Sequence, residues 1–240
     1  MIRNDTILVA VSAVDSELGV IQPISEIAKI TQTYPNCLLH VDATQAIGKV
    51  ELSFDGVDTA SLTAHKFYGP SGIGLLYKRR ELVIEPLIHG GTGASLYRSG
   101  TPTVALAAAF DHALGLALKN RKQRYERVKQ LNTRLRERFS SYPDVRINSP
   151  ADAAPHILNL SVSGVKGTVF RDALSAHGIC VSVKSACSTD GTPSRAVYAV
   201  SHDRKNALSS WRISLSHLTT DAEVTAFLNA FDICYKELKK

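Results

Sequence analysis

The stretch SLTAHKFYGPSG, residues 61–72, places Lys66 between a histidine and a turn-forming Tyr-Gly-Pro sequence. Upstream of it lies LLHVDATQ, residues 38–45, in which a short apolar run ends at Asp42. Short apolar runs bounded by polar residues are typical of buried strands. Ligands of parallel sheets bind beyond the carboxyl ends of the strands, and Asp42 and Lys66 both fall at such ends. The two segments therefore predict an α/β layer structure whose ligand site contains an acid and a lysine.

The rest of the first half alternates between strand-like and helix-like segments, which favours α/β layers with a mainly parallel sheet. The pattern predicts buried strands at 6–11, 38–41 and 59–62, a strand at 72–77, a helix opened by Pro23 and a long helix that begins at Pro102. Proline is favoured in the first turn of a helix because its missing N–H group has no partner there in any case.

Near Asn120 the composition changes from alanine-rich to basic, and we expect a domain boundary there. Residues 1–120 would form part of a large domain and residues 121–240 a small C-terminal α/β domain. Its predicted elements are strands at 157–162, 179–183 and 211–215, a helix at 168–176 and a final helix after 219–221. Thr220, followed by Asp221 and Glu223, is a good N-cap signature for that last helix.

The composition is that of an ordinary globular protein. Of 240 residues, 44% are hydrophobic and 21% charged, and neither a long apolar run nor a signal-peptide pattern is present, so we expect a cytoplasmic location without membrane contact. The cysteines are Cys37, Cys180, Cys187 and Cys234. Their wide spacing matches no metal-ligand pattern, so no metal site is expected, and in the cytoplasm most of them should be buried thiols.

The net charge of +6 raises the question of nucleic-acid binding, because much of the excess lies between residues 119 and 138. In the same segment Val128, Leu131, Leu135 and Phe139 recur at helical spacing. The basic residues are therefore better explained as the solvated face of an amphipathic helix. We expect no nucleic-acid partner, since no recognition motif accompanies the charge.

The pairing of Asp42 with Lys66 is what a pyridoxal phosphate site requires. The lysine amine forms a Schiff base with the cofactor aldehyde, and the carboxylate keeps the pyridine nitrogen protonated so that the ring accepts electrons. Taken singly, Asp42 could cap the next helix and Lys66 could be a surface lysine. Gln45 follows Asp42 closely and His65 directly precedes Lys66, and both favour the cofactor site over those simpler explanations.

Four motifs, DATQ at 42–45, AHK at 64–66, RSGT at 98–101 and SACS at 185–188, occur in the order known from cysteine desulfurases. The chain resembles that family, which belongs to the fold-type I, class V aminotransferase-like group of pyridoxal phosphate enzymes. The resemblance implies part of the large cofactor-binding domain followed by the small C-terminal domain. Family members carry an N-terminal stretch with a phosphate-binding turn and a ring-stacking histidine that has no counterpart here, so the chain looks like a C-terminal portion.

The resemblance also assigns roles to individual residues. The cofactor-binding set is Asp42, Gln45, Thr63, His65, Lys66 and Thr101. In it, Gln45 bonds the ring hydroxyl oxygen, and Thr63 and His65 lie on the phosphate side. Thr101 reaches the phosphate of the neighbouring subunit's cofactor, which implies a homodimer. Alternatively, Thr101 is the N-cap of the helix that begins at Pro102.

Cys187 follows an apolar strand in a loop-forming segment, so we expect it to be exposed, whereas Cys180 falls within that strand. In the resembled mechanism Lys66 abstracts the α-proton of the substrate and Cys187 takes its sulfur as a persulfide. Arg212 binds the substrate carboxylate through its guanidinium fork, unless it is simply a strand-edge surface arginine. Ser16 stands where the family often has an asparagine that contacts cofactor and substrate.

The function favoured by these residues is that of a cysteine desulfurase. It would convert L-cysteine to L-alanine and pass the sulfur to an acceptor protein for iron–sulfur cluster assembly or thiolation. One alternative is a related pyridoxal phosphate lyase that acts on selenocysteine or cysteine sulfinate. Another is an incomplete, non-catalytic fragment that dimerises or binds a partner.

Overall fold

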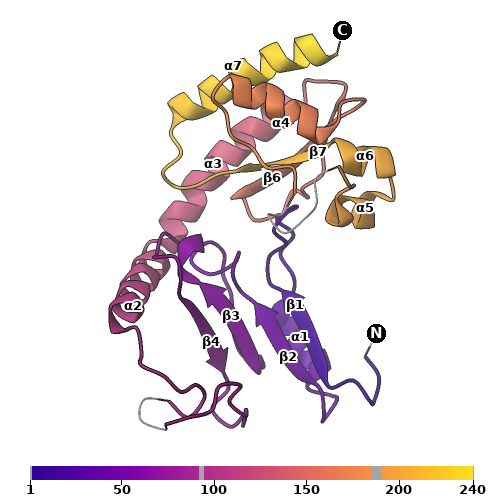
Figure 1. The fold of residues 1–240 in the computed structure, drawn as a ribbon. Helices are drawn as coiled ribbons and strands as arrows, with labels where there is room; N and C mark the ends of the chain where they lie inside the picture. Colours follow the sequence, from indigo (N-terminus) through magenta and orange to yellow (C-terminus); the bar gives the residue numbers. More distant parts are fainter. Residues whose placement is uncertain (1, 92–94, 185–190, 240) are drawn as a thin grey trace. The chain divides into compact units, whose positions relative to one another are not determined.

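In the computed structural model, residues 2–91, 95–184 and 191–239 are described. The chain divides into two compact units. Unit 1 comprises Met1–Ala13 and Gln22–Asn120, and unit 2 comprises Val14–Ile21 and Arg121–Lys240 (Figure 1). The break near Asn120 coincides with the change from the alanine-rich helix to the basic one, and the short segment 14–21 leaves unit 1 to pack with unit 2.

Unit 1 is built on a four-stranded sheet in the order β1-β2-β3-β4. Its elements are β1 (Leu8–Ser12), α1 (Ile24–Thr31), β2 (Leu38–Asp42), β3 (Thr59–Thr63), the 3₁₀ turn η1 (Ala64–Lys66), β4 (Gly74–Lys78) and α2 (Val104–Lys119). The first three strands are parallel, as the sequence predicts, and β4 is antiparallel to β3. Only residues 64–73 join β3 to β4, which is too short for a parallel crossover of a dozen or more residues.

The two faces of this sheet differ. Leu39, Val41 and Ala60 are fully buried on one face. On the other face the side chains of β2 and β3 are half-buried, and those of β1 are exposed. The prediction of a buried first strand is therefore wrong, since Leu8 is 52% exposed. The reason is that β1 is the edge strand of the sheet and its Leu8 side faces away from the core.

Helix α2 begins two residues later than the sequence predicts. Its N-cap is Thr103, whose side chain makes no capping hydrogen bond, and its first residue is Val104. Thr101 is thus not the N-cap, which removes the alternative role considered for it.

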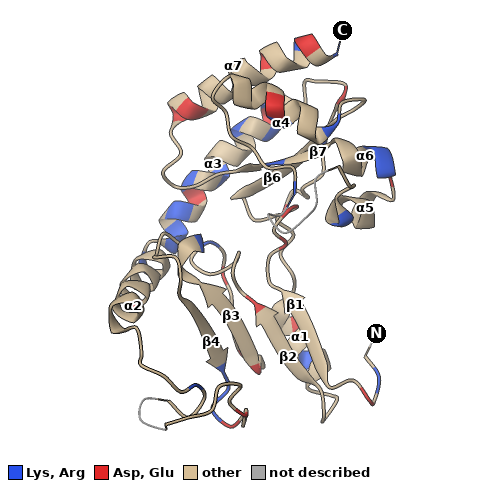
Figure 2. Cartoon of the chain, viewed as in Figure 1, with Lys and Arg blue, Asp and Glu red and all other residues tan. Residues whose placement is uncertain are grey.

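Unit 2 contains an antiparallel sheet in the order β5-β6-β7. Its elements are α3 (Arg121–Phe139), β5 (Val145–Ile147), β6 (Ile157–Val162), α4 (Gly167–Ala176), α5 (Arg195–Ser201), α6 (Arg204–Ser209), β7 (Ser210–Ser214) and α7 (Asp221–Leu238). The predicted apolar face of α3 is confirmed, because Val128, Leu131, Leu135 and Phe139 are each at most 1% exposed in the core. Figure 2 shows Lys and Arg along that helix, interspersed with acidic and uncharged residues.

The predicted strand at 179–183 does not form. Within that segment only Ser182 pairs with β7, through an isolated bridge to Arg212. Cys180, which the sequence places inside a buried strand, is exposed as a consequence. The β-branched residues of the segment suit a strand, but a strand also needs a continuous partner, and here the pairing stops after one residue.

Segment 14–21 forms a small hairpin closed by a bridge between Val14 and Ile21. The Asp15 carboxylate accepts hydrogen bonds from the backbone N–H groups of Glu17 and Leu18, which shapes the turn. Leu18, at 2% exposure, packs on Val197 of α5 and Ala207 of α6. This apolar anchor makes the hairpin an integral part of unit 2.

Among the residues that the structure describes, no helix combines the length and the apolar character required to cross a lipid bilayer.

Candidate functional site

Asp42 is the last residue of β2, and its half-buried side chain lies at the carboxyl end of the sheet. Its Oδ1 atom accepts a hydrogen bond of 2.9 Å from the backbone N–H of Thr44, which stabilises the turn that follows the strand. Within the described part of the chain Oδ2 has no partner. One carboxylate oxygen thus stabilises the local turn, and the other is free to accept a hydrogen bond from a ligand.

His40 lies two residues before Asp42 and therefore on the same face of the sheet. Its ring nitrogens contact two hydroxyls of β3, with Nδ1 2.8 Å from Thr59 Oγ1 and Nε2 3.3 Å from Ser61 Oγ. Ser61 is also the register partner of Asp42. The histidine thus orders the polar surface next to the carboxylate, a role that the alternation of the strand could have revealed from the sequence.

Lys66 ends η1, the turn that directly follows β3. The backbone around it is held firmly: Phe67 stacks edge-on against Phe110 of α2, and a side chain on Gly69 would meet the Ala64 Cβ at 2.7 Å. The Lys66 side chain itself is exposed, and its amine bonds to none of the described residues. A fixed backbone with a free amine is suited to covalent attachment of a carbonyl ligand.

Thr63 and His65 lie beside this lysine and contact each other, with Thr63 Oγ1 2.9 Å from His65 Nδ1. Thr63 Oγ1 also lies 3.3 Å from the Ile73 carbonyl oxygen, which can only accept. If the hydroxyl donates to that carbonyl, Nδ1 must carry a proton and donate to the hydroxyl. In the neutral ring the exposed Nε2 is then left as an acceptor, and on protonation it becomes a second donor for an anion.

Gln45 follows Asp42 in the turn after β2, and its Oε1 accepts a hydrogen bond of 2.9 Å from Lys49 Nζ. Because an ammonium group only donates, this contact identifies the oxygen of the amide and leaves the NH₂ group as the available donor. An amide donor at this place matches the expected bond to a ring hydroxyl oxygen.

Thr101 is exposed and makes no hydrogen bond to a described residue. The segment before it is tied by Ser99, which donates from its backbone to the Ile88 carbonyl and from its hydroxyl to the His89 carbonyl. The role expected for Thr101 requires a second subunit. Cys187 lies outside the described residues.

Arg212 and Ser16 meet within unit 2. Arg212 Nη1 donates to the Ser16 carbonyl oxygen at 2.6 Å, and Nε donates to Ser214 Oγ at 3.2 Å. Burial lowers the pKa of the guanidinium, while the carboxylates of Glu17 and Asp15 oppose that shift. The contact uses the backbone of Ser16 rather than its side chain, so the hairpin can hold Arg212 with serine in place of asparagine.

A buried pair in unit 2 has no counterpart in the sequence analysis. The Ser194 hydroxyl donates to Glu17 Oε2 at 2.5 Å and accepts from the Val197 backbone N–H at the start of α5. Glu17 is 9% exposed and Ser194 1% exposed. This pair fixes the hairpin that contacts Arg212, and residues so far apart in the sequence carry no local signal of their pairing.

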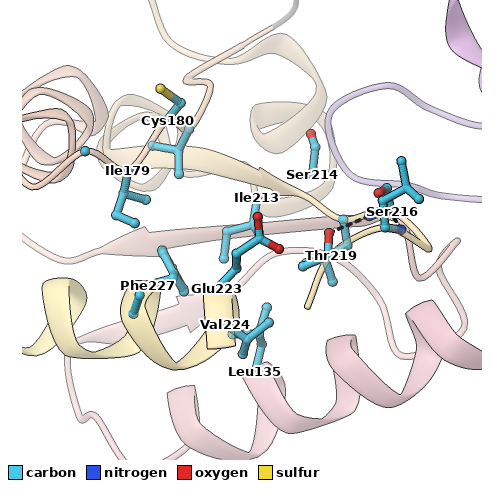
Figure 3. Close-up of a pocket in the computed structure, with 15 residues that line it drawn as sticks. Leu135, Ile179, Cys180, Ile213, Ser214, Ser216, Thr219, Glu223, Val224 and Phe227 are labelled. Atoms are coloured by element: carbon cyan, nitrogen blue, oxygen red, sulfur yellow. Dashed lines mark hydrogen bonds between the residues drawn. The ribbon is translucent and has the colours of Figure 1, made fainter. Parts of the chain in front are cut away.

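Unit 2 also has a hollow of about 410 Å³ between β7, α7 and residues 178–181 (Figure 3). Cys180 lies at its edge with its sulfur directed away from Glu223. Glu223 itself is occupied by the N-cap of α7, because it accepts from the Thr220 backbone. The hollow therefore holds neither a free acid nor an inward thiol, and we assign it no chemistry.

The polar groups of unit 1 form a set that suits pyridoxal phosphate. They are a carboxylate with one free oxygen, a free amine on a rigid turn, an amide donor and a hydroxyl–imidazole pair. Arg212 and Ser16 form a separate group in unit 2.

The family model for aminotransferase class-V matches residues 1–227, which is most of the chain. The chain belongs to the class-V aminotransferase family. It is 36% identical over 99% of its length to a NifS/IcsS protein homolog of Lactobacillus delbrueckii subsp. bulgaricus. To the cysteine desulfurase IscS of Dictyoglomus turgidum it is 35% identical, again over 99% of its length.

Among solved structures, a NifS-like protein superposes on the whole of this class-V chain with a TM-score of 0.88 at 31% identity. The α/β fold expected from the resemblance is thereby confirmed. The chain spans 61% to 63% of the length of these three proteins.

Proposed function

We propose that this chain is part of a pyridoxal phosphate-dependent cysteine desulfurase. Such an enzyme converts L-cysteine to L-alanine, holds the sulfur as a persulfide on Cys187 and passes it to an acceptor protein for iron–sulfur cluster assembly or thiolation. The observation that carries the proposal is the free amine of Lys66 on a packed turn, in the same compact unit as the free Asp42 oxygen. The relatives named cysteine desulfurase support the choice of reaction.

The cofactor would be held by residues of unit 1. Lys66 would bind its aldehyde carbon, the free Oδ2 of Asp42 would keep its ring nitrogen protonated, and Gln45 would donate to its ring hydroxyl oxygen. Thr63 and His65 would lie on its phosphate side, where the Thr63 hydroxyl orients the His65 ring and the protonated Nε2 of that ring donates to the phosphate. Thr101 would reach the phosphate from a second subunit of a homodimer. When bound, pyridoxal phosphate supplies the electron sink for reaction at the substrate α-carbon.

Residues of this chain would bind the substrate, remove its α-proton and accept its sulfur. Arg212, already oriented by the Ser16 carbonyl, would bind the carboxylate of L-cysteine through its remaining donors. The Lys66 amine would take the α-proton at Nζ. In the sulfur transfer, the Cβ–S bond of the substrate breaks, an S–S bond to Cys187 forms, and the substrate carbon gains a proton to yield alanine.

Because the chain spans little more than three fifths of its relatives, the activity, the cytoplasmic location and the sulfur acceptor are proposals for the complete protein. One alternative is a non-catalytic chain that dimerises or binds a partner. A lyase for selenocysteine or cysteine sulfinate would use the same unit 1 residues.

The proposal is tested by mass spectrometry of the chain, loaded with pyridoxal phosphate and exposed to L-cysteine. We expect one added sulfur atom on Cys187 and equimolar alanine, and no stable persulfide in Cys187→Ala. A persulfide that persists in Cys187→Ala would contradict the mechanism, and absence of alanine from the loaded wild-type chain would favour the non-catalytic alternative.

A further inference from the structure

Unit 2 contains a polar pocket of about 630 Å³ that the proposed reaction does not use. Its walls come from β5, β6, residues 163–166 and α6. Three cationic side chains line it, each from a different segment: Arg146 from β5, Lys166 from the residue before α4, and Lys205 from α6. Lys and Arg on α6 are visible in Figure 2.

The cations of this pocket outnumber its carboxylates by three to two. In the described part of the chain, no side-chain nitrogen of the three cations forms an ion pair or a hydrogen bond. The two carboxylates in the lining are engaged elsewhere: Asp144 binds Lys239 at 3.2 Å and Tyr235 at 3.0 Å, while Asp203 accepts the first N–H groups of α6 as its N-cap. The pocket therefore keeps a net positive field, which attracts an anion.

An unpaired hydroxyl in the lining adds a specific donor to this field. Ser209 lines the pocket and is 8% exposed, yet its hydroxyl bonds to no described residue. Its neighbour in the lining, Ser161, differs, because that hydroxyl donates to the Asn206 carbonyl and accepts from Asn148. The Ser209 hydroxyl is therefore available to donate to a ligand in the pocket.

We propose that this pocket binds a soluble phosphate monoester. Its phosphate would contact Arg146, Lys166 and Lys205 and would accept from the Ser209 hydroxyl. A phosphate carries close to two negative charges and three acceptor oxygens, which matches clustered cations plus a hydroxyl. The volume is that of small-molecule sites and exceeds what a bare phosphate fills, so an ester is favoured over the free ion.

The test is calorimetric titration of the 240-residue chain, without added pyridoxal phosphate, with glycerol 3-phosphate and with inorganic phosphate. We expect saturable one-to-one binding that is tighter for the ester. Ser209→Ala and Lys205→Gln should each raise the Kd by about tenfold, the effect of losing one hydrogen bond to a charged group. The matched controls Ser175→Ala and Lys236→Gln, on exposed positions of α4 and α7, should leave the Kd unchanged.

Three results would overturn the proposal. The first is the absence of saturable binding of either probe. The second is binding that Ser209→Ala and Lys205→Gln do not weaken, since the phosphate would then lie elsewhere in the chain. The third is tighter binding of an oligoglutamate peptide that competes with glycerol 3-phosphate, because the surface would then recognise an acidic polypeptide. Far-ultraviolet circular dichroism of each variant checks that it is folded.

Discussion

Truncation of Leu18 to alanine should destabilise unit 2, although Leu18 lies more than a hundred residues before the rest of that unit in the chain. Its side chain is 2% exposed and packs on Val197 and Ala207, which are 0% and 2% exposed. The hairpin around it also supplies the carbonyl of Ser16 to Arg212. The substitution therefore tests whether this remote segment is packed on the unit that contains Arg212, the residue proposed to bind the substrate.

The size of the effect follows from burial. Replacing a buried leucine by alanine costs about 2–5 kcal/mol of unfolding free energy, depending on the cavity that remains. The cluster around Leu18 is small, so we expect a loss near the lower end, about 2–3 kcal/mol. With a urea m-value of about 1–3 kcal/mol per molar, the unfolding midpoint should fall by about 0.7–3 M.

The fluorescence of Trp211 provides the assay, because it is the one tryptophan in the sequence and is fully buried on β7 of unit 2. Its emission during urea unfolding reports on unit 2 alone. Leu116→Ala is the control, since Leu116 is 44% exposed on α2 of unit 1, and it should shift the Trp211 transition by less than about 0.5 kcal/mol. A Leu18→Ala midpoint equal to that of wild type would refute the packing of the hairpin on unit 2.

Three further predictions concern single sites. Thr220→Ala should lower the unfolding free energy by about 1 kcal/mol, the usual worth of an N-cap. Hydrogen bonds from Thr220 lower the pKa of Glu223, so the stabilisation from the Thr220–Glu223 contact is complete above the ordinary pKa of glutamate and is lost as the pH falls through the lowered pKa. In urea titrations, the difference in unfolding free energy between wild type and Thr220→Ala should therefore be smaller at pH 3 than at pH 7. Iodoacetamide should modify Cys187 faster than Cys180 and leave the two buried cysteines for last, and faster labelling of Cys180 would contradict a reactive Cys187. Light scattering should show a homodimer at micromolar concentration, and a monomer would count against a phosphate contact from Thr101 of a second subunit.

Three local signals in the sequence predict the structure correctly. The predicted N-cap of α7 at Thr220 is confirmed, and the structure adds that Thr220 and Glu223 bond each other's backbone N–H groups. The apolar spacing of α3 likewise identified its buried face, because helical periodicity depends on that segment alone. The carboxyl end of β2, where Asp42 lies, was located because a buried strand is a short apolar run with polar limits.

Features that depend on contacts between distant segments could not be predicted from the sequence. The attachment of Leu18 to α5 and α6 and the bond between Glu17 and Ser194 join residues that only the folded chain brings together. Cys180 was misplaced because a β-branched run predicts a strand whether or not a partner strand exists. The cations around Ser209 come from three segments, so no window of the sequence reveals their convergence.

The proposed attachment of pyridoxal phosphate to Lys66 is tested most directly by incubating the 240-residue chain with the cofactor, reducing it with borohydride and mapping its peptides by mass spectrometry. We expect a pyridoxyl group on the peptide that contains Lys66 and its loss in Lys66→Arg. The control Lys236→Arg, at an exposed position of α7, should retain the label. A pyridoxyl group on another lysine, with Lys66 unmodified, would contradict the proposed attachment.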